Sequence, residues 1–163
     1  MAQGTGYVNG SDLLLSLSSS ASGTFKAFGH CTSHTCTFSS ETKERAVKPA
    51  ASVTTLGAGL WKDKSVNGLS VQIKGDGLRY YGEAENGFKD LLGLWKTGAL
   101  IYIKAFVRSN DTAPYLSGAF VISSVEQTGG AGEDATYSVT LDNSGEVTID
   151  DAKVDGVAAG TGQ

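Results

Sequence analysis

The chain has 163 residues, a formal net charge of −4, 22 glycines and 2 prolines. This length fits one domain, which at this size buries about 68–70% of its unfolded surface and needs no disulfide or metal to hold its core. The glycine content is typical of turn-rich β structure, and the negative charge argues against a stable nucleic-acid-binding protein, which usually carries a clustered basic face. Mild repulsion would nevertheless suit a surface past which nucleic acid slides.

The N-terminal part of the sequence predicts a flexible arm followed by a strand. Residues 1–11 are polar and Gly-rich, and we expect them to be mobile until something binds them. The apolar run Leu13–Leu17 is too short for a signal peptide and lacks a basic leader. We assign it instead to a first strand over Asp12–Ser18. No window approaches the ~20 apolar residues of a membrane helix, so we expect a protein made in a cytoplasm, without membrane insertion.

A second, long strand is predicted over Thr24–Ser40, and it carries two cysteines and two histidines. On a continuous strand the Cα atoms of Cys31 and Cys36 lie about 16 Å apart, too far for a disulfide unless the chain turns between them. His30 and His34 would lie about 13 Å apart, too far to share one zinc ion. We therefore expect a packed or surface strand with two free cysteines, as in a reducing compartment, rather than a metal site.

Residues 41–66 predict a long loop, because neither a helical nor an alternating period survives there. Loops of this length are uncommon in compact domains and are usually functional or disordered. The segment holds a mixed-charge run with Glu44, Arg45 and Lys48, and Trp61 lies near its end. The sequence leaves two interpretations of Trp61 open: it folds back onto the core of its own domain, or it docks on a partner, since Trp is enriched at interface hot spots.

A half-buried strand and the single helix follow. Leu69–Lys74 alternates between apolar and polar residues, and Gly75–Gly77 allows a kink before the strand continues. Glu83–Thr97 predicts an amphipathic helix that ends at Gly98. An isolated helix of this length would be marginal, so its apolar stripe must cover a sheet. If Trp95 is buried there, Trp95→Ala should lower the free energy of unfolding by about 3–5 kcal/mol. The stripe consists of Phe88, Leu91, Leu92 and Trp95.

Three strong strands and a short one complete the chain, over Leu100–Val107, Tyr115–Gln127, Thr136–Leu141 and Glu146–Ile149. Tyr137, Val139 and Leu141 form a core face, whereas the two strands before them are apolar on both faces. That pattern is expected where both sides are covered, by the helix and a second sheet or by another subunit. We predict a mainly β fold, a β-sandwich or barrel of two packed sheets with one flanking helix, over residues 12–150, and a flexible tail over 151–163.

No pattern in the sequence predicts an enzyme. There is no G-x-S-x-G elbow, and the two histidines lie together on one predicted strand. The acidic pairs Glu83/Glu85 and Glu133/Asp134 fall at a helix start and in a glycine turn, where solvated charges are far commoner than a glycosidase pair. The glycine runs GAG and GGAG lack the Lys-Ser/Thr of a phosphate loop, so we expect no cofactor.

A soluble carbohydrate-binding module is the alternative from another class. Such β-sandwiches usually show several exposed aromatic side chains on one sheet face. Tyr80, Tyr81 and Trp61 are candidates, but their spacing does not make a planar platform on one strand.

Several phrases of the sequence resemble the major tail tube proteins of long, non-contractile-tailed bacteriophages. The resemblance runs from about Asp12 to Ile149, through DLLLSL, KAFGHCTSHTCTFSSET, WKDKSVNGLSVQIKGDG and GFKDLLGLWKTG. The closing phrase, YLSGAFVISSVEQTGGAGEDATYSVTLDNSGEVTI, is its most specific part. Within KAFGHCTSHTCTFSSET, the pattern of two cysteines and two histidines belongs to no assigned motif of that family.

The resemblance implies a structural protein of the virion tail, assembled in the host cytoplasm. Subunits would join in six-membered rings that stack into a hollow tube; partners would be a tape-measure protein, tail-tip or baseplate proteins, a tail terminator, and genomic DNA that passes without sequence-specific binding. Inner tubes of contractile tails and of type VI secretion share the fold and are the nearer alternative. We expect Glu44, Arg45, Lys48 and Trp61 to contact the neighbouring ring, because the long loop is the candidate for leaving the ring plane.

Overall fold

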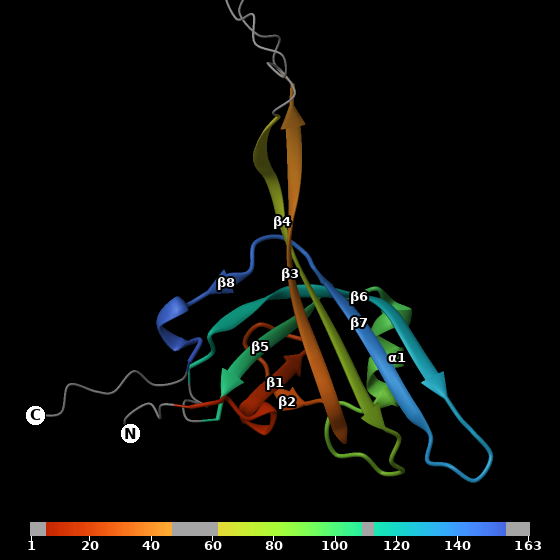
Figure 1. Ribbon diagram of the computed structural model, residues 1–163. Helices are drawn as coiled ribbons and strands as arrows, with labels where there is room; N and C mark the ends of the chain where they lie inside the picture. The colour runs from red at the N-terminus through yellow and green to blue at the C-terminus, as the bar shows by residue number, and fades with distance from the viewer. Residues whose placement is uncertain (1–5, 47–61, 109–112, 156–163) are drawn as a thin grey trace, which may run out of the picture.

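The computed structural model describes residues 6–46, 62–108 and 113–155 (Figure 1). The described part is built of antiparallel strands with one α-helix, which confirms the predicted mainly β class with a single helix. The elements are η1 (Gly10–Asp12), β1 (Leu13–Ser18), β2 (Lys26–Ala27), β3 (Cys31–Arg45), β4 (Asp63–Leu78), α1 (Phe88–Thr97), β5 (Ile101–Val107), β6 (Leu116–Thr128), β7 (Thr136–Asn143), β8 (Thr148–Ile149) and η2 (Asp151–Lys153), where η marks a 3-10 turn.

The strands hydrogen-bond in one path, in the order β2-β1-β5-β6-β7-β4-β3, and β8 pairs with β6 beside it. β6 pairs with β5 over Leu116–Phe120 and with β7 over Phe120–Thr128, so this one strand joins the two halves of the sheet. A register shift between Ile122 and Ser124 lies just past the junction, and such bulges bend a strand. The two packed layers are therefore two halves of one bent sheet.

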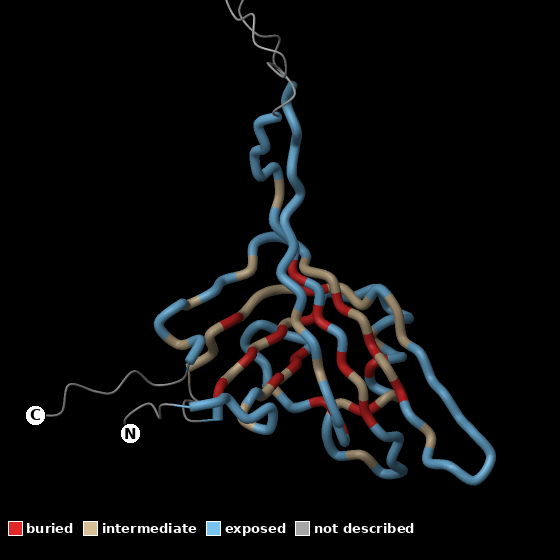
Figure 2. Tube along the Cα trace, in the orientation of Figure 1, coloured by how far each residue is buried: buried red, intermediate tan, exposed pale blue. Residues whose placement is uncertain are grey.

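Both halves contribute to one hydrophobic core. Leu17 of β1 and Ile103 of β5 belong to the same buried cluster as Ile73 of β4 and Leu141 of β7. Burial alternates along β5 and β7, as a period of two requires, so the predicted core face of β7 is confirmed. Figure 2 shows that the buried residues gather in the body of the molecule.

The predicted second strand is interrupted. The chain pairs over Lys26–Ala27, turns through Phe28–Gly29 and His30, and starts β3 at Cys31. His30 has a φ of 46°, in the left-handed region. The prediction that His30 belongs to a continuous strand is therefore wrong. Phe28 is buried and bridges in parallel to Asn86, which ties this turn to the segment before the helix.

The helix begins later than predicted, at Phe88 instead of Glu83, because Glu83 takes part in the preceding turn through a hydrogen bond from the Glu85 backbone N–H. It ends as predicted at Gly98, whose φ of 66° suits glycine.

Only half of the predicted apolar stripe packs against the body. Leu91 is 0% exposed and Phe88 packs against the core, but Leu92 is 40% and Trp95 51% exposed. Leu94 packs in their place, so the helix is rotated from the predicted contact line, and the expected large cost of Trp95→Ala is wrong.

The chain ends also contain short ordered turns. Asn9 caps η1 by accepting from the Ser11 N–H, and Asp150 caps η2 and pairs with Lys153 at 2.9 Å. Residues 1–5 of the predicted flexible arm over 1–11, and residues 156–163 of the predicted flexible tail over 151–163, lie outside the described residues.

Two leucines on consecutive helix positions test this assignment. Leu91→Ala should lower the free energy of unfolding by about 2–5 kcal/mol, because the residue is fully buried. Leu92→Ala removes the same atoms from an exposed position and should cost less than about 1 kcal/mol. Urea denaturation of the unassembled subunit measures both, and equal losses would contradict the helix orientation.

Candidate assembly surfaces

β3 and β4 continue as a paired hairpin far beyond the rest of the sheet. Their pairing runs from Cys31 opposite Gly77 to Arg45 opposite Asp63, whereas β4 pairs with β7 only over Gln72–Leu78. Residues 39–45 and 63–70 therefore project from the body; we call them the arm (Figure 1). At about 3.3 Å per residue the arm extends roughly 23 Å.

The arm corrects the predicted long loop. Residues 41–45 and 63–66 are strand, and the missing alternation has a physical reason: neither face of the arm is buried, so no face needs to be apolar. Leu69, predicted on the core face with Val71 and Ile73, is exposed because it lies beyond the body. Figure 2 shows almost the whole arm as exposed.

Of the four residues predicted for the ring contact, two are placed by the structure. Glu44 and Arg45 lie at the end of the arm, next to the start of β4. Lys48 and Trp61 lie outside the described residues. Glu44 binds Lys64 at 2.9 Å and Lys62 at 3.4 Å, and such exposed pairs contribute at most about 1 kcal/mol each.

The arm also presents apolar side chains and a strand edge. Val66 and Leu69 are exposed on the arm, and Phe38 is exposed at its base. β3 is the last strand of the sheet order, so among the described strands its outer edge has no partner. A two-stranded hairpin without a core is marginal alone, and an open edge pairs readily with another chain.

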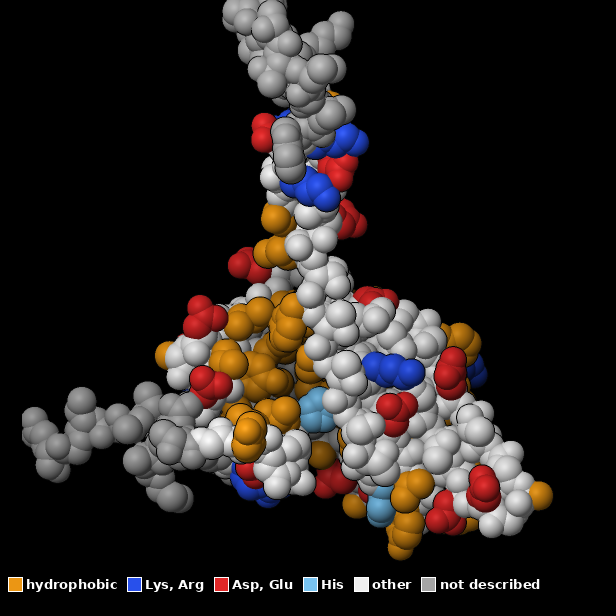
Figure 3. All heavy atoms as spheres, viewed as in Figure 1, with side chains coloured by type: hydrophobic (Ala, Val, Ile, Leu, Met, Phe, Trp, Pro, Cys, Tyr) orange, Lys and Arg blue, Asp and Glu red, His pale blue; other side chains and the backbone are white. Residues whose placement is uncertain are grey.

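A hydrophobic area lies beside β3 under the arm, where Figure 3 shows apolar side chains gathered in a hollow of the surface. On β3, Cys36 packs against the core, and burial raises the pKa of its thiol. Burial, and then the nearby Cys36, raise the pKa of Tyr115, and burial lowers the pKa of His34. All three shifts favour the neutral forms of these side chains.

Neither cysteine forms a disulfide, and among the described residues no group of three His, Cys, Asp or Glu side chains lies together as metal ligands would. No helix of the described part is both long and apolar enough to cross a membrane.

The end of the body opposite the arm is held by the turn before α1. His30 Nδ1 hydrogen-bonds Glu83 Oε2, and the His30 ring stacks on Tyr80 with centroids 4.5 Å apart. Tyr137 Oη donates to the Gly29 carbonyl at 2.5 Å. A Cβ at Gly77 would come within 2.6 Å of the Tyr137 ring, so glycine is needed at this close approach.

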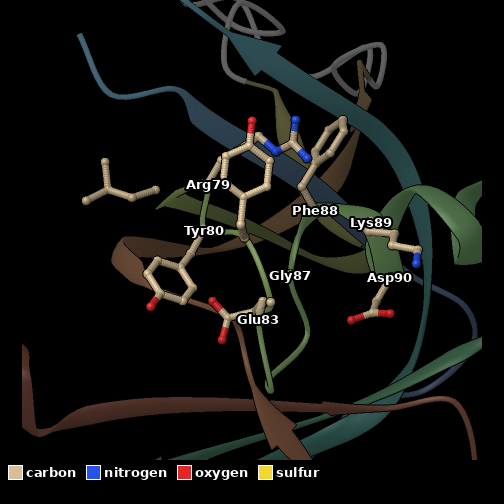
Figure 4. A pocket seen from close by; sticks show the side chains of 10 residues that line it. Arg79, Tyr80, Glu83, Gly87, Phe88, Lys89 and Asp90 are labelled. Carbon is tan, nitrogen blue, oxygen red and sulfur yellow. The ribbon is translucent and has the colours of Figure 1, made fainter.

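Two hollows adjoin this turn. In the first, of about 300 Å³, Figure 4 shows Arg79 beside the Phe88 ring, with 4.7 Å between the Arg79 Cζ and the ring centroid. The second, of about 470 Å³, lies between Arg79–Tyr81 and the β6–β7 turn at Glu133–Ala135. Sequence reasoning considered these tyrosines only as a carbohydrate platform and the acidic pair only as solvated charge. The sequence does not reveal the sheet order, in which β7 pairs with β4 and so brings the turn after β4 next to the β6–β7 turn.

A core-bearing domain with an exposed arm, an open strand edge and an apolar hollow is typical of a subunit built for assembly. The sequence agrees: residues 7–149 match the phage tail tube protein family, and the chain belongs to that family. No curated protein sequence matches the chain.

Solved tail structures have the same fold. A chain from the tail of an empty gene transfer agent particle, refined with C6 symmetry, is 18% identical with a TM-score of 0.70, over 88% of this chain and 99% of that one. The corresponding match in a native gene transfer agent virion has 17% identity and a TM-score of 0.68, over 88% and 99%. The SPP1 tail tube matches with 17% identity and a TM-score of 0.60, over 88% and 80%.

The Glu83 contact predicts an acid-sensitive part of the stability. The hydrogen bond from His30 holds the pKa of Glu83 below its ordinary value of 4.5. Ionised Glu83 therefore stabilises the fold above about pH 4.5, and this contribution is lost as the pH falls through the lower folded-state pKa. Between about pH 5 and pH 3 the wild-type unfolding midpoint should fall more steeply than that of Glu83→Gln.

Glu85→Gln is the matched control, because it removes the same charge from the same turn without touching His30. It should keep the steep wild-type dependence in denaturant titrations at each pH. Parallel curves for the wild type and Glu83→Gln would contradict the assignment.

Proposed function

We propose that this chain is the repeating subunit of a tail tube: six copies close into a ring, and the rings stack into a hollow tube that delivers a genome. The observation that carries the proposal is the family match over residues 7–149. The C6 symmetry of the similar gene transfer agent tail supports the ring size. The body over 12–150 acts as one structural unit.

Contact within the ring needs surfaces that meet side by side. The outer edge of β3 and the apolar hollow beside it provide a strand edge and a hydrophobic area of the kind that such joints use. Head-to-tail contacts between identical subunits close into rings when the rotation permits it.

Contact between rings needs an element that leaves the ring plane, and the arm is the longest projection of the described residues. Glu44 and Arg45 lie at the end of its described part, and we assign Lys48 and Trp61 to the same contact. Burial of Val66 and Leu69 against a neighbour would provide the apolar contact that the isolated arm lacks.

The partners follow from a tube. A tape-measure protein occupies the bore during assembly in the host cytoplasm, tail-tip or baseplate and terminator proteins close the two ends, and genomic DNA later passes through the virion tail. The net charge of −4 suits passage without sequence-specific binding, because it disfavours adhesion of phosphates. The role is structural and not enzymatic.

Negative-stain electron microscopy of the purified full-length protein tests the proposal. The expected result is rings with six-fold symmetry, or tubes of stacked rings. A preparation that stays monomeric at every concentration, also with tail-tip and tape-measure proteins added, would refute it.

Shortening the arm separates ring formation from stacking. Thr42 and Val66 are paired, so replacing residues 43–65 by an Asn-Gly turn closes the hairpin without changing its register. The variant should give folded subunits or rings whose thermal unfolding matches the wild type, but no tubes. Tubes of normal length from this variant would contradict the assignment of the arm to the contact between rings.

A further inference from the structure

We propose that the basic end of the arm docks into the tyrosine-lined cleft at the opposite end of a copy in the next ring. This inference rests on the proposed function and names the surface that receives the arm. The cleft, of about 470 Å³, is lined by Arg79, Tyr80, Tyr81, Glu133, Asp134 and Ala135.

The cleft and the arm tip lie at opposite ends of one hairpin. Leu78, the last residue of β4, pairs with Thr136 next to the cleft, whereas Arg45 pairs with Asp63 at the arm end. Cys31–Arg45 spans roughly 46 Å at about 3.3 Å per residue. Figure 1 shows the arm at one end of the molecule and the β4–α1 and β6–β7 turns at the other. A contact between these ends repeats without closing on itself, as stacking requires.

The aromatic side chains of the cleft are open to an occupant. Tyr81 is 98% exposed and Tyr80 is 63% exposed, although Tyr80 stacks on His30 with one face. Exposed tyrosines beside one another favour contact with another protein, and their ring faces attract cations such as guanidinium and ammonium groups.

The charges of the cleft are acidic and uncompensated. Glu133 and Asp134 are exposed and form no ion pair with a described residue. Arg79, their cationic neighbour, is engaged elsewhere: its Nη1 donates to Gln127 Oε1 at 2.7 Å, and its guanidinium covers the Phe88 ring. An occupant that brings lysine or arginine is therefore favoured over an acidic or neutral one.

The arm end provides such cations. Glu44 is already bound by Lys62 and Lys64, whereas Lys43 and Arg45 are exposed and form no ion pair with a described residue. Two carboxylates and two tyrosines in the cleft thus match two cations on the arm. The complementarity selects a second copy of this chain as the occupant.

Charge exchange tests the pairing in the full-length protein. Glu133→Lys with Asp134→Lys should reduce the amount of sedimentable tube by at least about tenfold while rings persist, because like charges then meet at the contact. Lys43→Glu with Arg45→Glu should do the same. All four changes in one chain restore opposite charges and should recover most of the tubes. Because these are exposed turn positions, the substitutions should leave the thermal unfolding midpoint unchanged. If a charge-reversed variant fails to fold, Glu133→Gln with Asp134→Asn replaces it as the test of the cleft charges.

Glu146→Lys with Asp151→Lys is the matched control, with the same change of net charge on exposed positions away from the cleft. It should keep tube formation, and an equal loss there would count against the cleft. Normal tubes from the cleft variant, or no recovery in the fourfold variant, would overturn the inference. If the wild type forms no tubes at all, the proposed function itself fails, so the two failures are distinguishable.

Discussion

Backbone hydrogen bonding between β3 and β4 continues well past the point where side-chain burial ends. This divides the molecule into a body with a hydrophobic core and an arm without one. Val71 is the last buried residue of β4 toward the arm, and its N–H donates to Asn143 Oδ1 at 3.0 Å. Beyond Val71, the two strands hydrogen-bond to each other and their side chains face water. Hydrogen bonds exchanged with water contribute little net stability, so the body is stabilised by its core and the arm is not. Among the described segments, the arm is therefore one that packing within the subunit stabilises little.

Sequence patterns located most of the body because the body obeys the periods on which such patterns rest. β5, β6 and β7 were predicted within a residue or two, since burial alternates along them or fills both faces. The helix was predicted, but its buried line was not, because Leu92 and Trp95 are as apolar as the residues that pack. The interruption at His30 was also missed, since a left-handed conformation at a histidine leaves little trace in composition.

The candidate assembly surfaces were predictable in part. The sequence drew attention to the segment around Glu44 and Arg45, but predicted a loop there, because an unburied hairpin has no hydrophobic alternation to reveal it. The cleft beside Tyr81 could not be predicted from spacing: Tyr81 and Glu133 become neighbours only because β7 pairs with β4, and that pairing is a property of the tertiary fold.

An exposed strand edge with apolar neighbours is also a risk for uncontrolled association, and the arm carries features that limit it. Its charges are mixed, with Lys43, Glu44 and Arg45 in succession on the edge strand, and charged edges resist pairing with arbitrary strands. A register shift between Glu41 and Thr42 increases the local twist within the arm. A partner must then supply both the right shape and the opposite charges. A generic hydrophobic surface would leave the arm charges desolvated and unpaired, so these features disfavour docking on such a surface.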